Sequence, residues 1–212
     1  MTDFKLYCFA QSGNAYKAAL MLALCDLDWE PVFVDYFAGE TRSDRFRAIN
    51  ELGEVPVLVH GGRTLSQSGV ILDYLTGETG RFGASSPEEG REILRWLFWD
   101  NHKLTSYTAT YRFLHTFTEG VAEQVADFLE KRMRGALDIL DRHLDGRTWV
   151  VGGDPTIADL SICGYLFFSE EFGVDWAGEY PNVGIWLGRI AGLKGWEHPY
   201  DLMPGHPLVG QS

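Results

Sequence analysis

Short apolar runs alternate with helical patterns over the first part of the chain. The run Phe4–Phe9 is broken at Gly13, and Ala15–Leu27 is rich in Ala and Leu, which predicts a strand that enters a helix through a polar turn. The β-rich run Pro31–Tyr36 and the charged helical spacing of Thr41–Asn50 continue the alternation. This order predicts a β-α-β unit.

A hairpin is predicted next. Val55–His60 forms a third apolar run, and the Gly61-Gly62 pair after it is a two-residue hairpin signal, so Arg63–Leu65 is expected to pair antiparallel with it. Helical periodicity returns over Gln67–Leu75. The predicted order is therefore β-α-β-α-β-β-α.

The pattern changes at residues 77–87, a stretch rich in Gly and Ser that is typical of a linker. Helical patterns without strands follow it: Glu88–Phe117, Val121–Leu144 and the segments that begin at Thr156 and near Asn182. We therefore expect two domains, an α/β domain over residues 1–80 and an all-helical domain over residues 87–212.

The composition limits the partners. Eighteen Lys and Arg against thirty Asp and Glu give a formal charge of -12, so the average surface repels phosphate backbones and anionic lipid, and neither nucleic acid nor a membrane is expected as a partner. The aromatic fraction is 14%, and aromatic rings that are not consumed by a core tend to line ligand pockets. An apolar small-molecule site is therefore expected.

The cysteines and the N-terminus favour a cytoplasmic protein. Cys8, Cys25 and Cys163 are odd in number and widely spaced, which argues against a disulfide framework and for a reducing compartment. The N-terminus has no basic start followed by an apolar run, and no apolar stretch approaches the roughly 20 residues that span a bilayer. The six histidines lack the spacing of zinc sites, so no metal is expected.

Three motifs resemble those of cytosolic glutathione transferases. The segment from Asn50 to Pro56 resembles the family's Asn-x-x-Gly-x-Val-Pro signature, Gln67–Ile71 resembles the start of its third helix, and Thr156–Leu160 resembles its Thr-x-Ala-Asp-Leu capping motif. The similarity extends from Phe4 to about Trp196. The turn Gln11–Lys17 resembles serine-type transferases of bacterial origin.

The resemblance implies a fold and a ligand. It implies a thioredoxin-like N-terminal domain that binds glutathione as co-substrate, an all-helical C-terminal domain that shapes a pocket for a small apolar electrophile, and a homodimer. The helical residues Trp99, His102, Ser106, Tyr107 and Tyr111 are candidates for that pocket, although such spacing is more often core. Asp100 resembles an acid that some classes use to reach the ligand's ammonium group.

The resemblance also assigns the glutathione contacts. Val55 would pair its backbone with the cysteinyl backbone of glutathione, and a cis Val55–Pro56 bond would turn these groups toward the ligand. The alternative is a trans proline that merely starts a strand. Ser68 would donate to the γ-glutamyl carboxylate at a helix N-terminus, and the Gln67 amide oxygen would accept from the ammonium. The alternative there is an ordinary helix cap at Ser66 or Ser68.

Ser12 is the expected activator of the thiol. A hydroxyl that donates to a charged sulfur is worth about 1.5 to 3 kcal/mol, enough to move a thiol pKa of about 8.5 to near neutrality. Asn14 could orient that hydroxyl or touch the sulfur, and Tyr7 is the rival acid because other classes use a tyrosine near the end of the first strand. The turn Ser12-Gly13-Asn14-Ala15 contains no sulfur, so disulfide exchange through the protein's own thiols is not expected.

Three functions remain in view. The first is addition of glutathione to apolar electrophiles. The second is reduction of peroxides or disulfides by the same bound thiolate, and the third is a non-catalytic binding module, since a fold does not fix a function. The Thr156–Asp159 pattern is a capping box with Asp in place of Glu, and we expect it to be structural.

Overall fold

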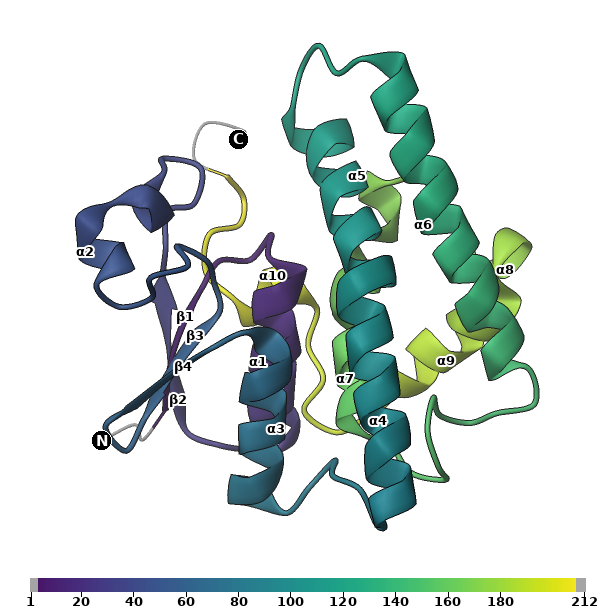
Figure 1. Ribbon diagram of the computed structural model, residues 1–212, viewed down its shortest axis with the longest axis horizontal. Coiled ribbons are helices and arrows are strands. Elements are labelled where there is room, and N and C mark those ends of the chain that lie inside the picture. Colours follow the sequence, from purple (N-terminus) through teal and green to yellow (C-terminus); the bar gives the residue numbers. More distant parts are fainter. Residues whose placement is uncertain (1–3, 209–212) are drawn as a thin grey trace. The chain divides into compact units, whose positions relative to one another are not determined.

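The computed structural model describes residues 4–208, which form two compact units (Figure 1). The first unit contains the described residues up to Arg81 together with those from Leu193 onward, and the second runs from Phe82 to Gly192. The expected division left the C-terminal tail with the helical domain, whereas the structure packs this tail with the first unit.

A four-stranded mixed sheet forms the centre of the first unit. Its spatial order is β2-β1-β3-β4, with β1 parallel to β2 and the other two pairs antiparallel. The strands are β1 (Phe4–Cys8), β2 (Trp29–Phe33), β3 (Val57–His60) and β4 (Arg63–Ser66). This arrangement confirms the predicted β-α-β unit and the hairpin.

Helices cover both faces of this sheet (Figure 1). The helices α1 (Gly13–Leu24) and α3 (Ser68–Thr79) lie side by side on one face, and Leu6 and Cys8 of β1 are fully buried. On the other face, Phe46 of the short helix α2 (Asp44–Arg47) packs into a small core with Val34 and Val57. The two faces alternate along β1 because side chains of a strand point to opposite sides.

The expected helix over Thr41–Asn50 is broken. The structure has a 3₁₀ turn, η1 (Glu40–Arg42), followed by α2, and Ser43 between them is extended. The Ser43 hydroxyl accepts from the Phe46 N–H at 3.1 Å and so restarts the chain as a new helix.

The tail returns to the first unit and runs along it through short contacts. The Tyr16 hydroxyl donates to the Glu197 carbonyl at 2.8 Å, and the Ala10 N–H donates to the Pro204 carbonyl at 2.8 Å. Between these contacts lies the short helix α10 (Pro199–Leu202).

The second unit is helical. The long pattern over residues 88–117 is continuous but contains one wider turn, a π-helix, at η2 (Asp100–Leu104). The elements are α4 (Pro87–Trp99), η2, α5 (Thr105–Phe117), α6 (Glu123–Leu144), α7 (Ile157–Ile162), η3 (Cys163–Glu171), α8 (Trp176–Glu179) and α9 (Pro181–Ala191). An α/β unit and a helical unit are the fold class that the sequence predicted.

The capping box at the start of α7 is confirmed. The Thr156 hydroxyl accepts from the Ala158 N–H, and the Asp159 carboxylate accepts from the Thr156 N–H. Asp159 also accepts from the Val150 N–H and from the indole N–H of Trp186, whose side chain is fully buried. The carboxylate therefore ties a loop, a helix start and α9 together, which is a structural role.

Candidate functional site

Ser12 lies in the turn between β1 and α1 and caps that helix. Its hydroxyl oxygen accepts from the Ala15 N–H at 3.1 Å, and the residue is 5% exposed. The cap uses an oxygen lone pair and leaves the hydroxyl proton available for a second partner. Ser12 can therefore cap the helix and donate to a ligand at the same time.

Asn14 occupies the first turn of α1 beside this serine. Within the described part of the chain, its buried amide oxygen has no hydrogen-bond partner, so this oxygen does not accept from the Ser12 hydroxyl. A buried acceptor left unsatisfied costs about 1–3 kcal/mol, and a ligand could supply the missing donor.

Tyr7, the rival acid, packs into the core beneath α2. Its ring meets the Phe46 ring edge-on at a centroid distance of 6.3 Å, next to Val34 and Val57. This position favours a packing role for Tyr7.

The loop before β3 is fixed by two residues of the Asn-x-x-Gly-x-Val-Pro motif. The buried Asn50 amide donates to the Glu54 carbonyl at 2.8 Å and accepts from the Leu52 N–H at 3.2 Å. Gly53 has φ +64°, and a Cβ there would lie 2.9 Å from the Thr41 carbonyl oxygen, so glycine is required. The Asn and Gly positions of the motif are thus explained by hydrogen bonds within the loop and by the close approach of the Thr41 backbone.

The Val55–Pro56 bond is cis, which excludes the alternative of a trans proline. Val55 is half-buried and lies just before β3 begins at Val57. Within residues 4–208, neither its N–H nor its C=O makes a backbone hydrogen bond. Both groups are available to pair with an extended peptide.

Gln67 and Ser68 begin α3. Gln67 is the N-cap residue with φ 69° and ψ 116°, and no side chain caps this helix. Neither Ser66 nor Ser68 therefore caps α3, which was the alternative role that the sequence left open. The uncapped N–H groups and the positive end of the helix dipole favour a carboxylate at this position. The Gln67 amide nitrogen donates to the Glu54 carboxylate at 3.2 Å.

These segments meet at one edge of the sheet. The strand register pairs Val57 with Tyr7 and also with Ser66. The end of β1, the start of β3 and the end of β4 therefore lie together, and Ser12, Val55 and Gln67 follow or precede those strand ends by only a few residues. The structure thus brings the segments that carry the expected site residues to one edge.

Comparison with known proteins identifies the family. Residues 2–77 match the model of the glutathione S-transferase N-terminal domain, and residues 101–194 match that of the C-terminal domain. The chain belongs to the glutathione S-transferase family.

Similar proteins span nearly the whole chain. A solved glutathione S-transferase from Xanthobacter autotrophicus Py2 is 34% identical with a TM-score of 0.84, and the match covers 92% of this chain and 95% of that one. The curated disulfide-bond oxidoreductase YfcG of Escherichia coli K12 is 28% identical over 86% of this chain and 87% of its own length.

Structural neighbours of the family bind glutathione. Glutathione transferase URE2P8 from Phanerochaete chrysosporium was solved with oxidised glutathione. It has a TM-score of 0.87 and covers 95% of each chain, and its identity of 22% shows a shared fold alone.

A cavity of about 250 Å³ lies in the first unit beside the turn that carries Ser12. The Phe9 and Tyr36 rings stack in its wall with centroids 5.0 Å apart. The lining residues are Phe9, Gln11, Phe33, Val34, Asp35, Tyr36, Phe37, Ala38, Gly205 and Leu208. This cavity was not predicted from the sequence, although the cluster of aromatic residues at positions 33–37 was a visible signal.

Asp100 does not fit the ligand role that its resemblance implied. It is 0% exposed, and its two carboxylate oxygens accept from the Thr105 hydroxyl at 2.8 Å and the Ser161 hydroxyl at 2.6 Å. The carboxylate is used within the helical unit, where it ties the π turn η2 to α7.

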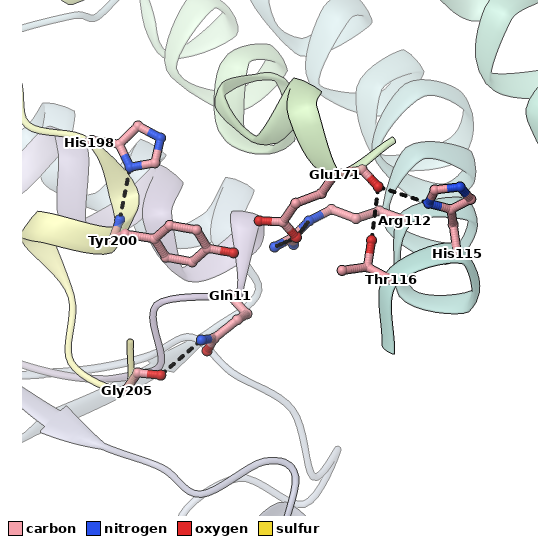
Figure 2. A network of polar contacts seen from close by, with 8 residues as sticks. All are labelled: Gln11, Arg112, His115, Thr116, Glu171, His198, Tyr200 and Gly205. Carbon is pink, nitrogen blue, oxygen red and sulfur yellow. Dashed lines mark hydrogen bonds and ion pairs between the residues drawn. The ribbon is translucent and has the colours of Figure 1, made fainter. Parts of the chain in front are cut away.

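Two of the other helical candidates, Trp99 and Tyr111, also pack within their own unit. The Trp99 ring lies edge-on to Trp96 with centroids 5.0 Å apart, and the Tyr111 ring stacks on His115 at 5.6 Å. The sequence did not single out the ion pair nearby, in which the buried Arg112 binds Glu171 at 2.7 Å. The Glu171 carbonyl accepts from His115 and Thr116, so this pair anchors η3 to α5 (Figure 2).

Two of the three thiols, those of Cys8 and Cys25, are poor nucleophiles. Burial raises the pKa of Cys8 to about 12, and burial also raises the pKa of Cys25. Residues 4–208 contain no group of three His, Cys, Asp or Glu side chains placed to hold a metal ion. No helix in this part of the chain is long and apolar enough to cross a membrane.

Proposed function

We propose that this protein is a glutathione transferase that holds the thiol of glutathione as a thiolate for attack on apolar electrophiles. The observation that carries the proposal is the Ser12 hydroxyl, whose oxygen is engaged as a helix cap while its proton remains available. When the thiolate reacts with a chloroaromatic substrate, its sulfur bonds to the ring carbon and chloride leaves. The thiol proton is released to solvent when the thiolate forms.

The magnitude of the effect is sufficient for catalysis. A hydrogen bond to a charged acceptor contributes about 1.5 to 3 kcal/mol, which lowers a thiol pKa by roughly one to two units. From a free value of about 8.5, the thiolate fraction at neutral pH rises from a few per cent to around half. The helix N-terminus behind Ser12 also favours a negative charge.

Backbone and side-chain groups at the sheet edge support the tripeptide's orientation. The free N–H and C=O of Val55, next to Pro56, can pair with the cysteinyl residue as an added strand would. The uncapped start of α3 and the Ser68 hydroxyl can receive the γ-glutamyl carboxylate. The sulfur then points toward the turn that holds Ser12 and Asn14.

The cavity beside Gln11 supports an apolar second substrate. Four of its ten lining residues carry aromatic rings, and planar electrophiles stack on such rings. This cavity lies within the first unit and adjoins the turn in which the thiolate would form.

A second activity deserves a test because the relative YfcG is named a disulfide-bond oxidoreductase. In such a reaction, the bound thiolate would attack a disulfide sulfur, and the other half would leave as a thiolate. Burial raises the pKa of Cys8 and of Cys25, which disfavours these two thiols as the nucleophile and leaves that role to bound glutathione. The third alternative, a binding module without catalysis, predicts no turnover of either kind.

We also propose a homodimer. Leu94 and Phe98 lie one turn apart on α4 and are 50% and 72% exposed, and Val70 on α3 is 53% exposed. Exposed large apolar side chains on two helices support association with a second copy. Light scattering coupled to gel filtration would measure the mass.

The experiment is turnover of a chloro-nitrobenzene electrophile, and of a small disulfide, by wild type and Ser12→Ala. We expect Ser12→Ala to lose about tenfold to a hundredfold in turnover, as 1.36 kcal/mol corresponds to a factor of ten. The matched control is Ser86→Ala, which removes the same kind of cap bond, also 3.1 Å long, from α4. If glutathione at millimolar concentration fails to raise the melting temperature, the module interpretation is correct.

A further inference from the structure

The cavity beside the turn that carries Ser12 is lined by four aromatic rings and one acid. Three of the rings form a cluster, in which Phe37 meets the stacked pair of Phe9 and Tyr36 edge-on, at centroid distances of 6.1 and 5.5 Å. Phe33 of β2 is the fourth ring. Phe33 and Phe37 are 47% and 43% exposed, so these two rings are not consumed by the core and can contact a ligand.

Asp35 is the one charged residue among the described residues that line this cavity. The turn after β2 uses only part of its half-buried carboxylate, because Oδ1 accepts from the Ala38 N–H at 2.9 Å. Oδ2 therefore keeps its capacity to accept from a ligand. The Asp35 N–H donates to the Glu40 carboxylate at 2.8 Å, which brings a second acid to the same turn. The negative charge at the cavity is thus fixed by the turn itself.

Aromatic rings beside a carboxylate favour a ligand with positive charge. The face of an aromatic ring is electrostatically negative and attracts a cation, and the nearby carboxylate adds a full negative charge in a partly desolvated place. At longer range, the formal charge of -12 on the chain also attracts cations. A neutral aromatic ligand gains the stacking alone, and an anionic one is repelled.

The size of the cavity limits the ligand. Its volume of about 250 Å³ lies just below the roughly 300–1,000 Å³ of pockets that bind drug-sized molecules, so a fused two-ring compound is the largest that fits comfortably. Gln11 and Gly205 also line the cavity, and their hydrogen bond of 2.8 Å joins the tail to the turn at this place (Figure 2).

We infer that this cavity binds planar aromatic cations, with the ligand's ring against Phe33 and Phe37 and its positive charge near Asp35. The inference deepens the proposed function, on which it rests for the ligand's role as second substrate: among apolar electrophiles, those with a positively charged ring are preferred. Binding to the cavity needs no glutathione, so the site and the thiol chemistry can be tested apart.

The test compares two ligands on four proteins by isothermal titration calorimetry at pH 7.5, without glutathione. The ligands are the 1-methylquinolinium cation and 4-methylquinoline, which share a ring system and a number of non-hydrogen atoms but differ in charge. The proteins are wild type, Asp35→Asn, Phe37→Leu and the control Asp44→Asn, which removes an exposed acid of α2 that does not line the cavity. In Asp35→Asn the amide oxygen can still accept from Ala38, and thermal unfolding checks that each variant is folded.

Wild type is expected to bind the cation about tenfold more tightly than the neutral ligand, a factor within the range of cation–π and charge contacts in partly desolvated sites. Asp35→Asn is expected to weaken the cation about tenfold and the neutral ligand little, so the preference nearly disappears. Phe37→Leu keeps the apolar bulk but removes a ring face, so it should weaken the cation more than the neutral ligand. Asp44→Asn keeps the wild-type preference.

Equal affinity of wild type for the two ligands overturns the inference, and so does an Asp35→Asn or Phe37→Leu variant that keeps the full preference. Loss of the preference in Asp44→Asn also overturns it, because the charge effect would then belong to the surface as a whole. Glutathione binding and chloro-nitrobenzene turnover are measured separately. Their absence would overturn the proposed function, and the cavity would then be a cation site without a role in thiol transfer.

Discussion

The side-chain amide of Gln11 donates to the carbonyl oxygen of Gly205 at 2.8 Å, across 194 positions of sequence (Figure 2). Together with the bond from the Ala10 N–H to Pro204, this contact fastens the tail to the turn that carries Ser12. The tail therefore helps to hold the turn in place, and its loss should affect both stability and turnover.

Gly205→Ala tests this role of the tail. Gly205 has φ +98°, and a Cβ there would lie 2.5 Å from a ring carbon of Phe33, so the substitution should push the tail off β2. We expect a loss of about 1–3 kcal/mol in the free energy of unfolding, with faster proteolytic release of the tail. Gly62→Ala is the control, because Gly62 has φ +78° with nothing within 4 Å of a Cβ. Equal effects of the two substitutions would contradict the tail's role.

Gln67→Gly should make the protein more stable and a weaker binder of glutathione. Glycine relieves the cost of φ 69°, about 1–3 kcal/mol, but adds about 0.5–1 kcal/mol of chain entropy, so a rise of roughly 2–4 °C in melting temperature is expected. Loss of the side chain should weaken glutathione binding about tenfold.

The matched control for Gln67→Gly is Asp26→Gly. Asp26 follows α1 and has φ 56°, so glycine relieves the same kind of strain away from the proposed site. Its melting temperature should rise while glutathione affinity stays unchanged, as differential scanning fluorimetry with and without glutathione would measure. Unchanged affinity in Gln67→Gly would remove Gln67 from the site.

His143 should make the helical unit sensitive to mild acid. Burial lowers the pKa of its imidazole, which lies tilted against the Trp96 ring with centroids 4.3 Å apart and donates from Nε2 to the Val150 carbonyl. The unfolded state then binds more protons than the folded state as the pH falls below about 6.5, so stability is lost in the interval from that value down to the lowered pKa.

Urea unfolding at pH 7.5 and 5.5 would measure this dependence in wild type and His143→Gln. The variant should lose less free energy of unfolding between the two pH values than wild type does. His102→Gln, at an exposed position on η2, is the control and should behave as wild type. An unchanged pH dependence in His143→Gln would show that another group is responsible.

Local signals explain what the sequence could predict. The order of strands and helices in the first unit follows from the alternation of short apolar runs and helical patterns. The Asn50, Gly53 and Thr156 motifs act on neighbours within a few residues or on one nearby turn, so spacing alone indicated them.

Long-range contacts explain what the sequence could not predict. The Asp100 carboxylate accepts a hydrogen bond from Ser161, 61 positions away, and the residues around Asp100 in its own helix do not indicate that partner. The tail docks on Gln11 across nearly the whole chain, and Glu54 meets Gln67 only because the hairpin brings them together. Ser43 breaks the expected helix over 41–50 by capping a new helix. Serine is a common N-cap residue, but the prediction followed the charged helical spacing instead.

The pKa of the thiol of bound glutathione tests the central claim most directly. Ultraviolet absorbance of the thiolate, followed against pH at saturating glutathione, gives this value for wild type, Ser12→Ala and Ser86→Ala. We predict a thiol pKa near neutrality for wild type and Ser86→Ala, and a return to about 8.5 for Ser12→Ala. A bound thiol whose pKa stays low in Ser12→Ala, or is never lowered in wild type, would contradict it.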